Sequence, residues 1–268
     1  IVVLIQNLFE EEIYMSEHMN TNKTTDALSE SASRWSAGAT AGWMLALFLA
    51  SFAVSSFLAE LFQMYFHLSD TEALLEYMKA HGDVESMLMM ALSAVLLVFL
   101  WALVRLKQKR PFTDYLPIRS VPMKHLFLWV AAALALALAM DFVTQRLGLP
   151  VSSFGEDIYA KSMNKWWLFG FVVVSAPLLE EMVFRGFVLA GFERLPFRDA
   201  PALAVALAAF TWALLHGQYH AHEMFGIFVL GVLLGFARLQ TRSLVTPLLM
   251  HAAINGLFLM EMADYLSV

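Results

Sequence analysis

Charged residues are scarce in this chain. Only 15% of its 268 residues are Asp, Glu, Lys or Arg, whereas 60% are hydrophobic, and the mean hydropathy is +0.65. A water-soluble domain needs a mostly polar surface, so this composition excludes one and predicts an integral membrane protein. Cysteine is absent, which excludes disulfides, thiolate metal sites and a cysteine nucleophile. Any chemistry must therefore rest on other side chains, such as Glu, His, Ser or Asn.

Long runs without a charge recur along the chain. A helix needs about 20 apolar residues to cross the roughly 30 Å hydrocarbon core, and a membrane β-barrel would instead show short alternating strands. The pattern predicts an all-α fold, a polytopic transmembrane helical bundle of about seven to eight spans. We expect the runs 200–215 and 224–237, which are short for a full span, to tilt or to border a water-filled cavity. The seven runs are 37–59, 86–104, 126–140, 166–190, 200–215, 224–237 and 244–260.

A polar stretch rich in Ser, Thr and Asn precedes the first run. It has too little apolar surface to pack, so we expect residues 1–35 to form a solvated tail. The first methionines are Met15 and Met19, and we expect residues 1–14 to lie upstream of the native start. Residues 36–160 are predicted to form N-terminal transmembrane helices and loops.

Basic residues gather between the second and third runs, whereas the preceding loop is acidic. The positive-inside rule therefore predicts a cytoplasmic loop at 105–124. Counting seven spans from there places the N-terminus in the cytoplasm and the C-terminus outside, for a multi-pass protein of the cell (plasma or inner) membrane. Without a nucleic-acid-binding motif the basic loop indicates topology, and we expect no nucleic-acid partner. The basic residues are Arg105, Lys107, Lys109, Arg110, Arg119 and Lys124.

The fourth run contains Glu180, Glu181 and Arg185. A charge at the centre of a bilayer costs about 2.5 to 3.5 kcal/mol even on lenient scales, so such residues call for a reason. Glu181 and Arg185 are four residues apart and can pair on one helix face. Glu180 points about 100° away and has no intrahelical partner. An unpaired carboxylate of this kind suits a general base or acid.

Two further runs carry polar side chains that a common cavity could gather. His216 ends the fifth run, one turn after Trp212, and His251 and Asn255 share one face of the seventh. Each element alone is compatible with a structural role, but together they predict a polar intramembrane cavity. Because His216 lies deeper than His251 relative to the start of its run, the two meet only if the fifth helix starts deep or runs obliquely.

Two other patterns favour structural roles. Gly231 and Gly235 form a small-xxx-small pair that allows close helix packing. His220, His222 and Glu223 resemble metal ligands in composition but lie in a predicted outer loop and lack the second His of HExxH. We therefore interpret the first pattern as packing and the second as a solvated turn.

These motifs resemble those of the CPBP intramembrane endopeptidases, the family of the type II CAAX prenyl endopeptidases and the bacterial Abi or bacteriocin-processing proteins. The resemblance rests on EExxxR beginning at Glu180, on the aromatic-xxxH element Trp212 to His216, and on HxxxN beginning at His251. It covers about 166–260. The family usually has Phe where this chain has Trp212.

The resemblance implies a catalytic helical core at 161–268. Glu180 and His216 would activate a water molecule, His251 and Asn255 would stabilise the oxyanion, and Glu181 and Arg185 would orient Glu180. Glu180, His216 and His251 could also hold zinc with a water in an open position. The family has been described both ways, and the metal-independent glutamate mechanism is the one we favour, with no cofactor certain.

The implied function is intramembrane hydrolysis of a peptide bond, with a membrane protein or lipidated peptide in the bilayer as substrate. Two other functions are compatible with the same residues. One is a non-catalytic immunity or scaffold protein that binds a peptide in the cavity. The other is a proton-coupled transporter, because Glu and His also mark proton pathways, although the sequence has no inverted repeat.

Overall fold

The computed structural model describes residues 35–107, 116–196 and 200–265, all within one compact unit. These ranges are helical and contain no β-strand, which confirms the all-α prediction. Six of their helices are long and apolar enough to cross a membrane, so the chain is a multi-pass membrane protein. The predicted tail, apart from Trp35, lies outside the described residues. The six are α3 (Ala37–Tyr65), α5 (Gly82–Lys107), α7 (Met123–Leu147), the composite helix Lys165–Phe192, α13 (Ala221–Thr241) and α14 (Val245–Tyr265).

The fifth predicted run, 200–215, corresponds to α12 (Ala200–Leu214), which has only 15 residues and is too short for a full crossing. Its shortness agrees with the expectation for 200–215. The expectation that 224–237 is short was wrong, because α13 has 21 residues. Its extra N-terminal turn is stabilised by a capping box, in which Glu223 accepts a hydrogen bond from the backbone N–H of His220.

The composite helix contains two π-helical segments. It runs through α9 (Lys165–Phe169), η1 (Gly170–Ser175), α10 (Ala176–Glu180), η2 (Glu181–Val188) and α11 (Leu189–Phe192). In η1 the N–H of Ala176 bonds to the carbonyl of Phe171, five residues back. The next residue, Pro177, has no N–H, so the π pattern leaves the carbonyl of Val172 without its partner along the helix.

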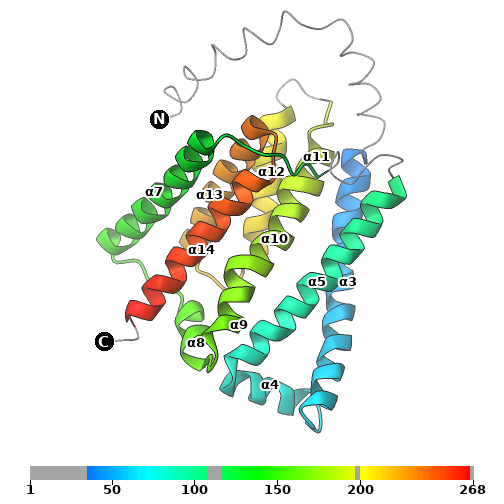
Figure 1. Ribbon diagram of the computed structural model, residues 1–268, viewed down its shortest axis with the longest axis vertical. Helices are drawn as coiled ribbons and strands as arrows, with labels where there is room; N and C mark the ends of the chain where they lie inside the picture. Colours follow the sequence, from blue (N-terminus) through cyan, green and yellow to red (C-terminus); the bar gives the residue numbers. More distant parts are fainter. Residues whose placement is uncertain (1–34, 108–115, 197–199, 266–268) are drawn as a thin grey trace, which may run out of the picture. The chain divides into compact units, whose positions relative to one another are not determined.

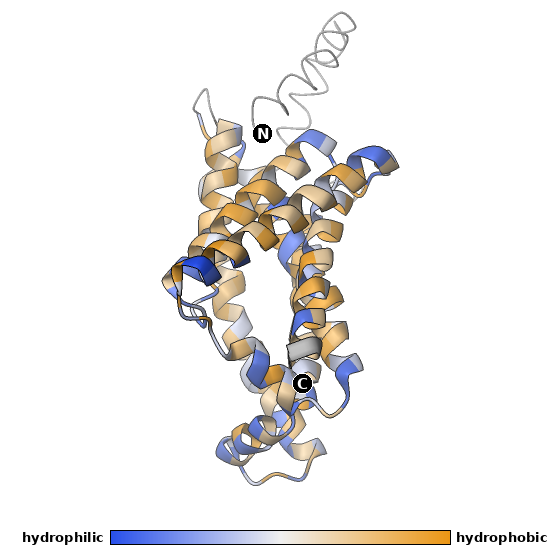
Figure 2. Ribbon diagram, turned by 90° about the vertical axis from the view of Figure 1, so that its left-hand side faces the viewer, coloured by the Kyte–Doolittle hydropathy of each residue, from blue (hydrophilic) through white to orange (hydrophobic). Residues whose placement is uncertain are grey.

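The composite helix packs against α5 and α14 through its first half and against α3 through η2 and α11, and α7 lies beyond α14 (Figure 1). The two short helices α4 (Thr71–Ala80) and α8 (Phe154–Lys161) lie at one end. Figure 2 shows hydrophobic residues along the long helices and hydrophilic ones mostly at their ends and in loops. Large side chains such as Phe52 and Phe127 are exposed there, as expected for surfaces that face lipid.

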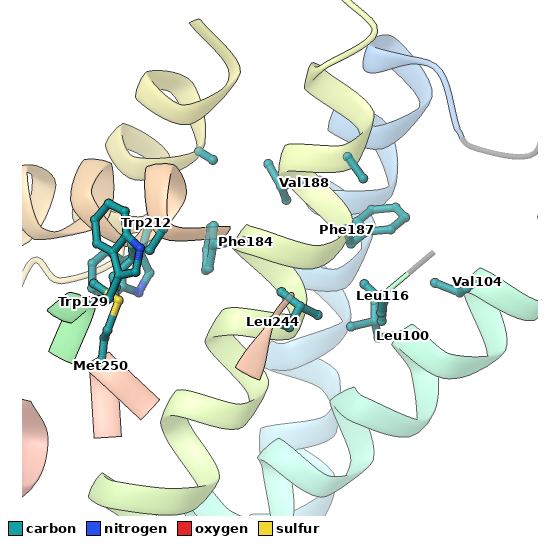
Figure 3. Close-up of a cluster of buried hydrophobic side chains, with 14 of the residues drawn as sticks. Leu100, Val104, Leu116, Trp129, Phe184, Phe187, Val188, Trp212, Leu244 and Met250 are labelled. Carbon is teal, nitrogen blue, oxygen red and sulfur yellow. The ribbon is translucent and has the colours of Figure 1, made fainter. Parts of the chain in front are cut away.

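The core joins η2 to its neighbours (Figure 3). Phe184, Phe187 and Val188 of η2 are buried in one cluster that also includes Leu100 and Val104 of α5. This packing fixes the depth of η2 in the bundle, and with it the positions of Glu181 and Arg185.

The small-xxx-small pair serves packing, as predicted. A Cβ atom on Gly231 would lie 2.9 Å from the Cβ of Ala209, and one on Gly235 would lie 2.7 Å from a methyl of Val205. Distances this short are not seen between real side chains, so α12 and α13 approach closely only because both positions are glycine.

Candidate active site

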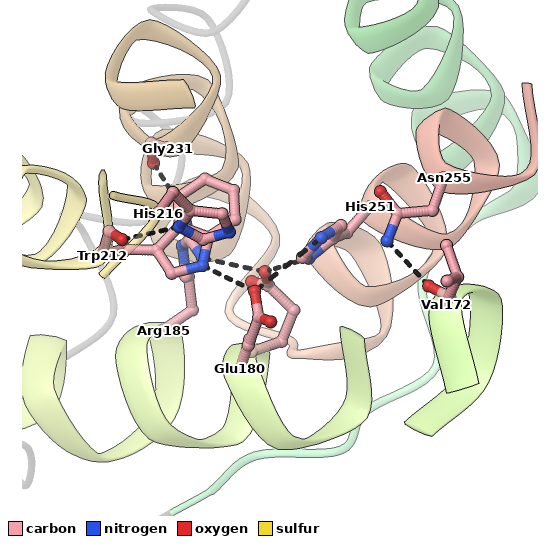
Figure 4. A network of polar contacts seen from close by, with 9 residues as sticks. Val172, Glu180, Arg185, Trp212, His216, Gly231, His251 and Asn255 are labelled. Atoms are coloured by element: carbon pink, nitrogen blue, oxygen red, sulfur yellow. Dashed lines mark hydrogen bonds and ion pairs between the residues drawn. The ribbon is translucent and has the colours of Figure 1, made fainter. Parts of the chain in front are cut away.

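Three charged or titratable side chains form a buried cluster between η2 and α14 (Figure 4). Glu181 and Arg185 are each only 1% exposed, and Nη1 of Arg185 donates to Oε1 of Glu181 at 2.8 Å. Nδ1 of His251 lies 2.9 Å from the same oxygen. Because a carboxylate only accepts, this contact makes Nδ1 the protonated nitrogen of His251. Arg185 also donates to the carbonyl of Gly231 at 3.4 Å. The predicted Glu181–Arg185 pair is present.

Glu180 points to a different environment, although it precedes Glu181 in the chain. Its side chain is 25% exposed, and its Oε2 accepts a 2.6 Å hydrogen bond from Nε1 of Trp212. Nε2 of His251 lies 4.0 Å from the same oxygen, which is too far for a direct hydrogen bond. Both neighbours come from other helices, in agreement with the lack of an intrahelical partner expected for Glu180.

Glu180 lines a cavity of about 460 Å³. One wall is apolar and comes from α3 and α5, with Met44, Leu47, Phe48 and Leu96. A polar wall is formed by Glu180 of α10 together with Trp212 and His216 at the end of α12. The cavity therefore offers a carboxylate and an imidazole beside an apolar chamber large enough for several side chains of a substrate.

His216 lies just after the end of α12. Its Nδ1 is 2.9 Å from the backbone carbonyl of Trp212, which can only accept, so Nδ1 carries the proton and Nε2 is the basic nitrogen. The indole of Trp212 contacts the rings of both His216 and His251, at centroid distances of 5.1 and 5.3 Å. The rings of His216 and His251 therefore both pack against the ring of Trp212. His216 reaches this position because α12 ends after 15 residues, at the depth of His251 in the bundle.

Tyr219 stacks on His216, with ring centroids 6.2 Å apart. Burial, together with the negative charges of Glu223 and Glu180, raises the pKa of Tyr219 to about 12. Its hydroxyl therefore stays protonated at any physiological pH. Tyr219 was not predicted as a site residue, because a lone Tyr in a loop carries no sequence signal of function.

Asn255 lies one turn beyond His251 on α14 and reaches a different helix. Its Nδ2 donates a 2.7 Å hydrogen bond to the carbonyl of Val172 in η1. One of its two N–H groups is therefore occupied by the backbone of the composite helix, and the amide orientation is fixed.

The His220 to Glu223 segment is structural rather than a solvated turn. His222 and Glu223 belong to the first turn of α13, and the Glu223 carboxylate accepts from the backbone N–H groups of both His220 and Ser152. These bonds cap α13 and attach it to the loop before α8.

The described residues show no preformed zinc site. Among the described residues no three His, Asp or Glu side chains come close enough together to hold a metal ion. The nitrogen left free on each histidine is Nε2, and that of His251 lies 4.0 Å from Oε2 of Glu180. Zinc ligands would all have to lie about 2.0 to 2.2 Å from one point.

Comparison with known families identifies the segment that carries this site. Residues 162–257, a little over a third of the chain, match the model described as type II CAAX prenyl endopeptidase Rce1-like. No curated protein and no solved structure matches the chain. The matched segment includes the EExxxR, WxxxH and HxxxN motifs. Residues 162–257 are thus similar to the type II CAAX prenyl endopeptidases, which supports a CPBP and CAAX protease assignment for the segment that carries the site.

Proposed function

We propose that this protein hydrolyses a peptide bond of a membrane-associated or lipid-modified protein, with Glu180 as the general base. One observation carries the proposal. Of two adjacent glutamates, Glu181 is buried and held by Arg185 and His251, whereas Glu180 faces the 460 Å³ cavity. A carboxylate that is partly exposed at the polar wall of an apolar chamber can accept a proton from water beside a bound peptide.

The reaction follows from these positions. Glu180 takes a proton from a water molecule as the water oxygen attacks the carbonyl carbon of the peptide bond. The carbonyl oxygen becomes an oxyanion in the tetrahedral intermediate. When the carbon–nitrogen bond breaks, the leaving amine takes the proton from Glu180. His216, whose basic Nε2 belongs to the same polar wall, orients the water and shares in the proton transfer.

His251 and Asn255 stabilise the oxyanion in this proposal. Glu181 accepts from Nδ1–H of His251 and so fixes the ring. In this proposal the ring carries a second proton at Nε2 during the reaction and donates it as a hydrogen bond to the developing charge. Asn255 offers its second N–H, while Val172 holds the first. Glu181 and Arg185 keep His251 and Glu180 in place and do not touch the substrate.

The apolar wall of Met44, Leu47 and Phe48 supports a substrate that enters from the bilayer. We further propose that the bundle lies in the plasma or inner membrane, with its N-terminus in the cytoplasm and its C-terminus outside. α3 begins and α14 ends at opposite ends of the described bundle, which is compatible with that topology (Figure 1). The mechanism needs no metal.

The test is cleavage of fluorogenic peptides, lipidated and plain, by the protein in liposomes, with and without a strong chelator. We expect Glu180→Gln to lower kcat about 10²- to 10⁴-fold, the usual contribution of a general base. Glu60→Gln changes an exposed glutamate of α3 and is the matched control, with activity unchanged. Chelator should have no effect, and inhibition by it would favour zinc. Full activity of Glu180→Gln would overturn the proposal and favour a binding protein or a transporter.

A further inference from the structure

Trp212 contacts four of the five charged or titratable residues predicted for the site, and Glu181 is the exception. Its Nε1 donates to Glu180, its ring lies 4.2 Å below the guanidinium carbon of Arg185, and its edges meet His216 and His251. It is buried at 2% exposure. Trp212 is the residue that donates a hydrogen bond to the glutamate facing the cavity and also contacts the buried ion pair, through Arg185.

These contacts close a ring. Glu180 accepts a hydrogen bond from Trp212, and Arg185 lies over the face of the Trp212 ring. Arg185 pairs with Glu181, which in turn contacts Nδ1 of His251. Nε2 of His251 then lies 4.0 Å from Glu180, where the series began. From the geometry we propose that Trp212 is a positioning residue that holds the Glu180 carboxylate in the orientation for proton transfer. This inference rests on the proposed function of Glu180 as the base.

The hydrogen bond engages only one carboxylate oxygen. Oε2 of Glu180 accepts from the indole, whereas Oε1 has no protein partner in the part of the chain that the structure describes. An indole N–H can donate but never accept, so it cannot take the proton that the carboxylate must receive. Trp212 thereby orients the carboxylate and leaves Oε1 free to accept a proton from water.

The surroundings keep the indole in one position. Arg185 lies over its face in a cation–π contact, which is strong in a buried site. A Cβ atom at Gly231 would lie 3.0 Å from Cε3 of Trp212 and 3.1 Å from Nη2 of Arg185. The absence of a side chain at Gly231 therefore gives the indole and the guanidinium the space to stack.

Trp212→Phe keeps an aromatic ring but removes the N–H, and Trp129→Phe is its matched control. Trp129 is also buried, but its Nε1 has no hydrogen-bond partner among the described residues. We expect Trp212→Phe to lower kcat about 10- to 100-fold, the effect of losing a hydrogen bond to a charged group, with KM within about twofold. Trp129→Phe should keep wild-type kcat. Equal kcat values for both variants would overturn the proposal.

A second measurement tests the contact without relying on activity. The chain has seven tryptophans, so protein labelled with ¹⁵N at Trp gives up to seven indole N–H signals. We expect Glu180→Gln to shift the indole signal of Trp212, which Trp→Phe variants at the other six positions assign by elimination, and Glu60→Gln to leave it in place. This experiment keeps Trp212, so it also applies if Trp212→Phe does not fold. An unmoved signal would overturn the proposal, whereas full hydrolysis by Glu180→Gln would overturn the proposed function instead.

Discussion

Asn255 donates a hydrogen bond from its side chain to the backbone carbonyl of Val172 at 2.7 Å. Val172 lies in the π-helical segment η1, where the N–H that would reach this carbonyl belongs to residue 177. Residue 177 is proline and has no N–H. The side chain of Asn255 therefore replaces a missing helix bond and ties α14, which carries His251, to the helix that carries Glu180.

The tie between α14 and η1 can be tested by supplying the missing donor. We expect Asn255→Ala to lower the free energy of unfolding by about 1 kcal/mol, the value of one hydrogen bond. Adding Pro177→Ala should recover part of this loss, because the new backbone N–H can bond to Val172. Thermal unfolding in detergent measures both variants.

Activity separates the two proposed roles of Asn255. Loss of an oxyanion donor lowers kcat about 10²- to 10³-fold, and Pro177→Ala cannot restore that donor. We therefore expect the double variant to regain stability but not kcat. Recovery of kcat together with stability would contradict an oxyanion role and leave Asn255 as a structural tie alone.

The buried pair Glu181–Arg185 should contribute far more to stability than an exposed pair. Arg185→Met removes the cation of the pair and leaves the buried carboxylate with His251 alone, and breaking a buried pair in this way costs about 3 to 5 kcal/mol. Lys161→Met is the matched control, because its 3.7 Å pair with Asp157 has side chains that are 43% and 58% exposed. Such a pair is worth at most about 1 kcal/mol. Similar shifts in the thermal midpoints of the two variants would contradict the buried pair as a stabilising element.

The raised pKa of Tyr219 predicts that the free energy of unfolding falls at alkaline pH. Its pKa is about 12 in the folded protein and near 10 in an unfolded chain, so below pH 10 both states keep the proton and the residue adds no pH dependence. Between pH 10 and 12 the unfolded state binds fewer protons, and the free energy of unfolding falls by at most about 3 kcal/mol. We expect Tyr219→Phe to show a smaller fall in thermal midpoint over this range. Parallel curves for the two proteins would refute the assignment.

Much of the fold follows from local patterns. Runs of about 20 apolar residues have one stable form in a bilayer, since a helix satisfies its own backbone hydrogen bonds there. The contact between Glu181 and Arg185 follows from their four-residue spacing, and the close packing at Gly231 from the small-xxx-small pair. The N-terminal extension of α13 could not be predicted as easily, because it depends on the capping bonds of Glu223.

The site itself shows where local patterns end. The sequence alone shows which positions carry charge inside the membrane. Each such residue has its own free-energy cost of leaving water, whatever its neighbours in the fold are. Only the tertiary structure decided that Glu180 meets Trp212 across 32 positions of sequence, that Asn255 reaches Val172, and that a cavity opens beside one glutamate and not the other. Such contacts depend on the depth and rotation of whole helices, which packing sets and no short stretch of sequence encodes.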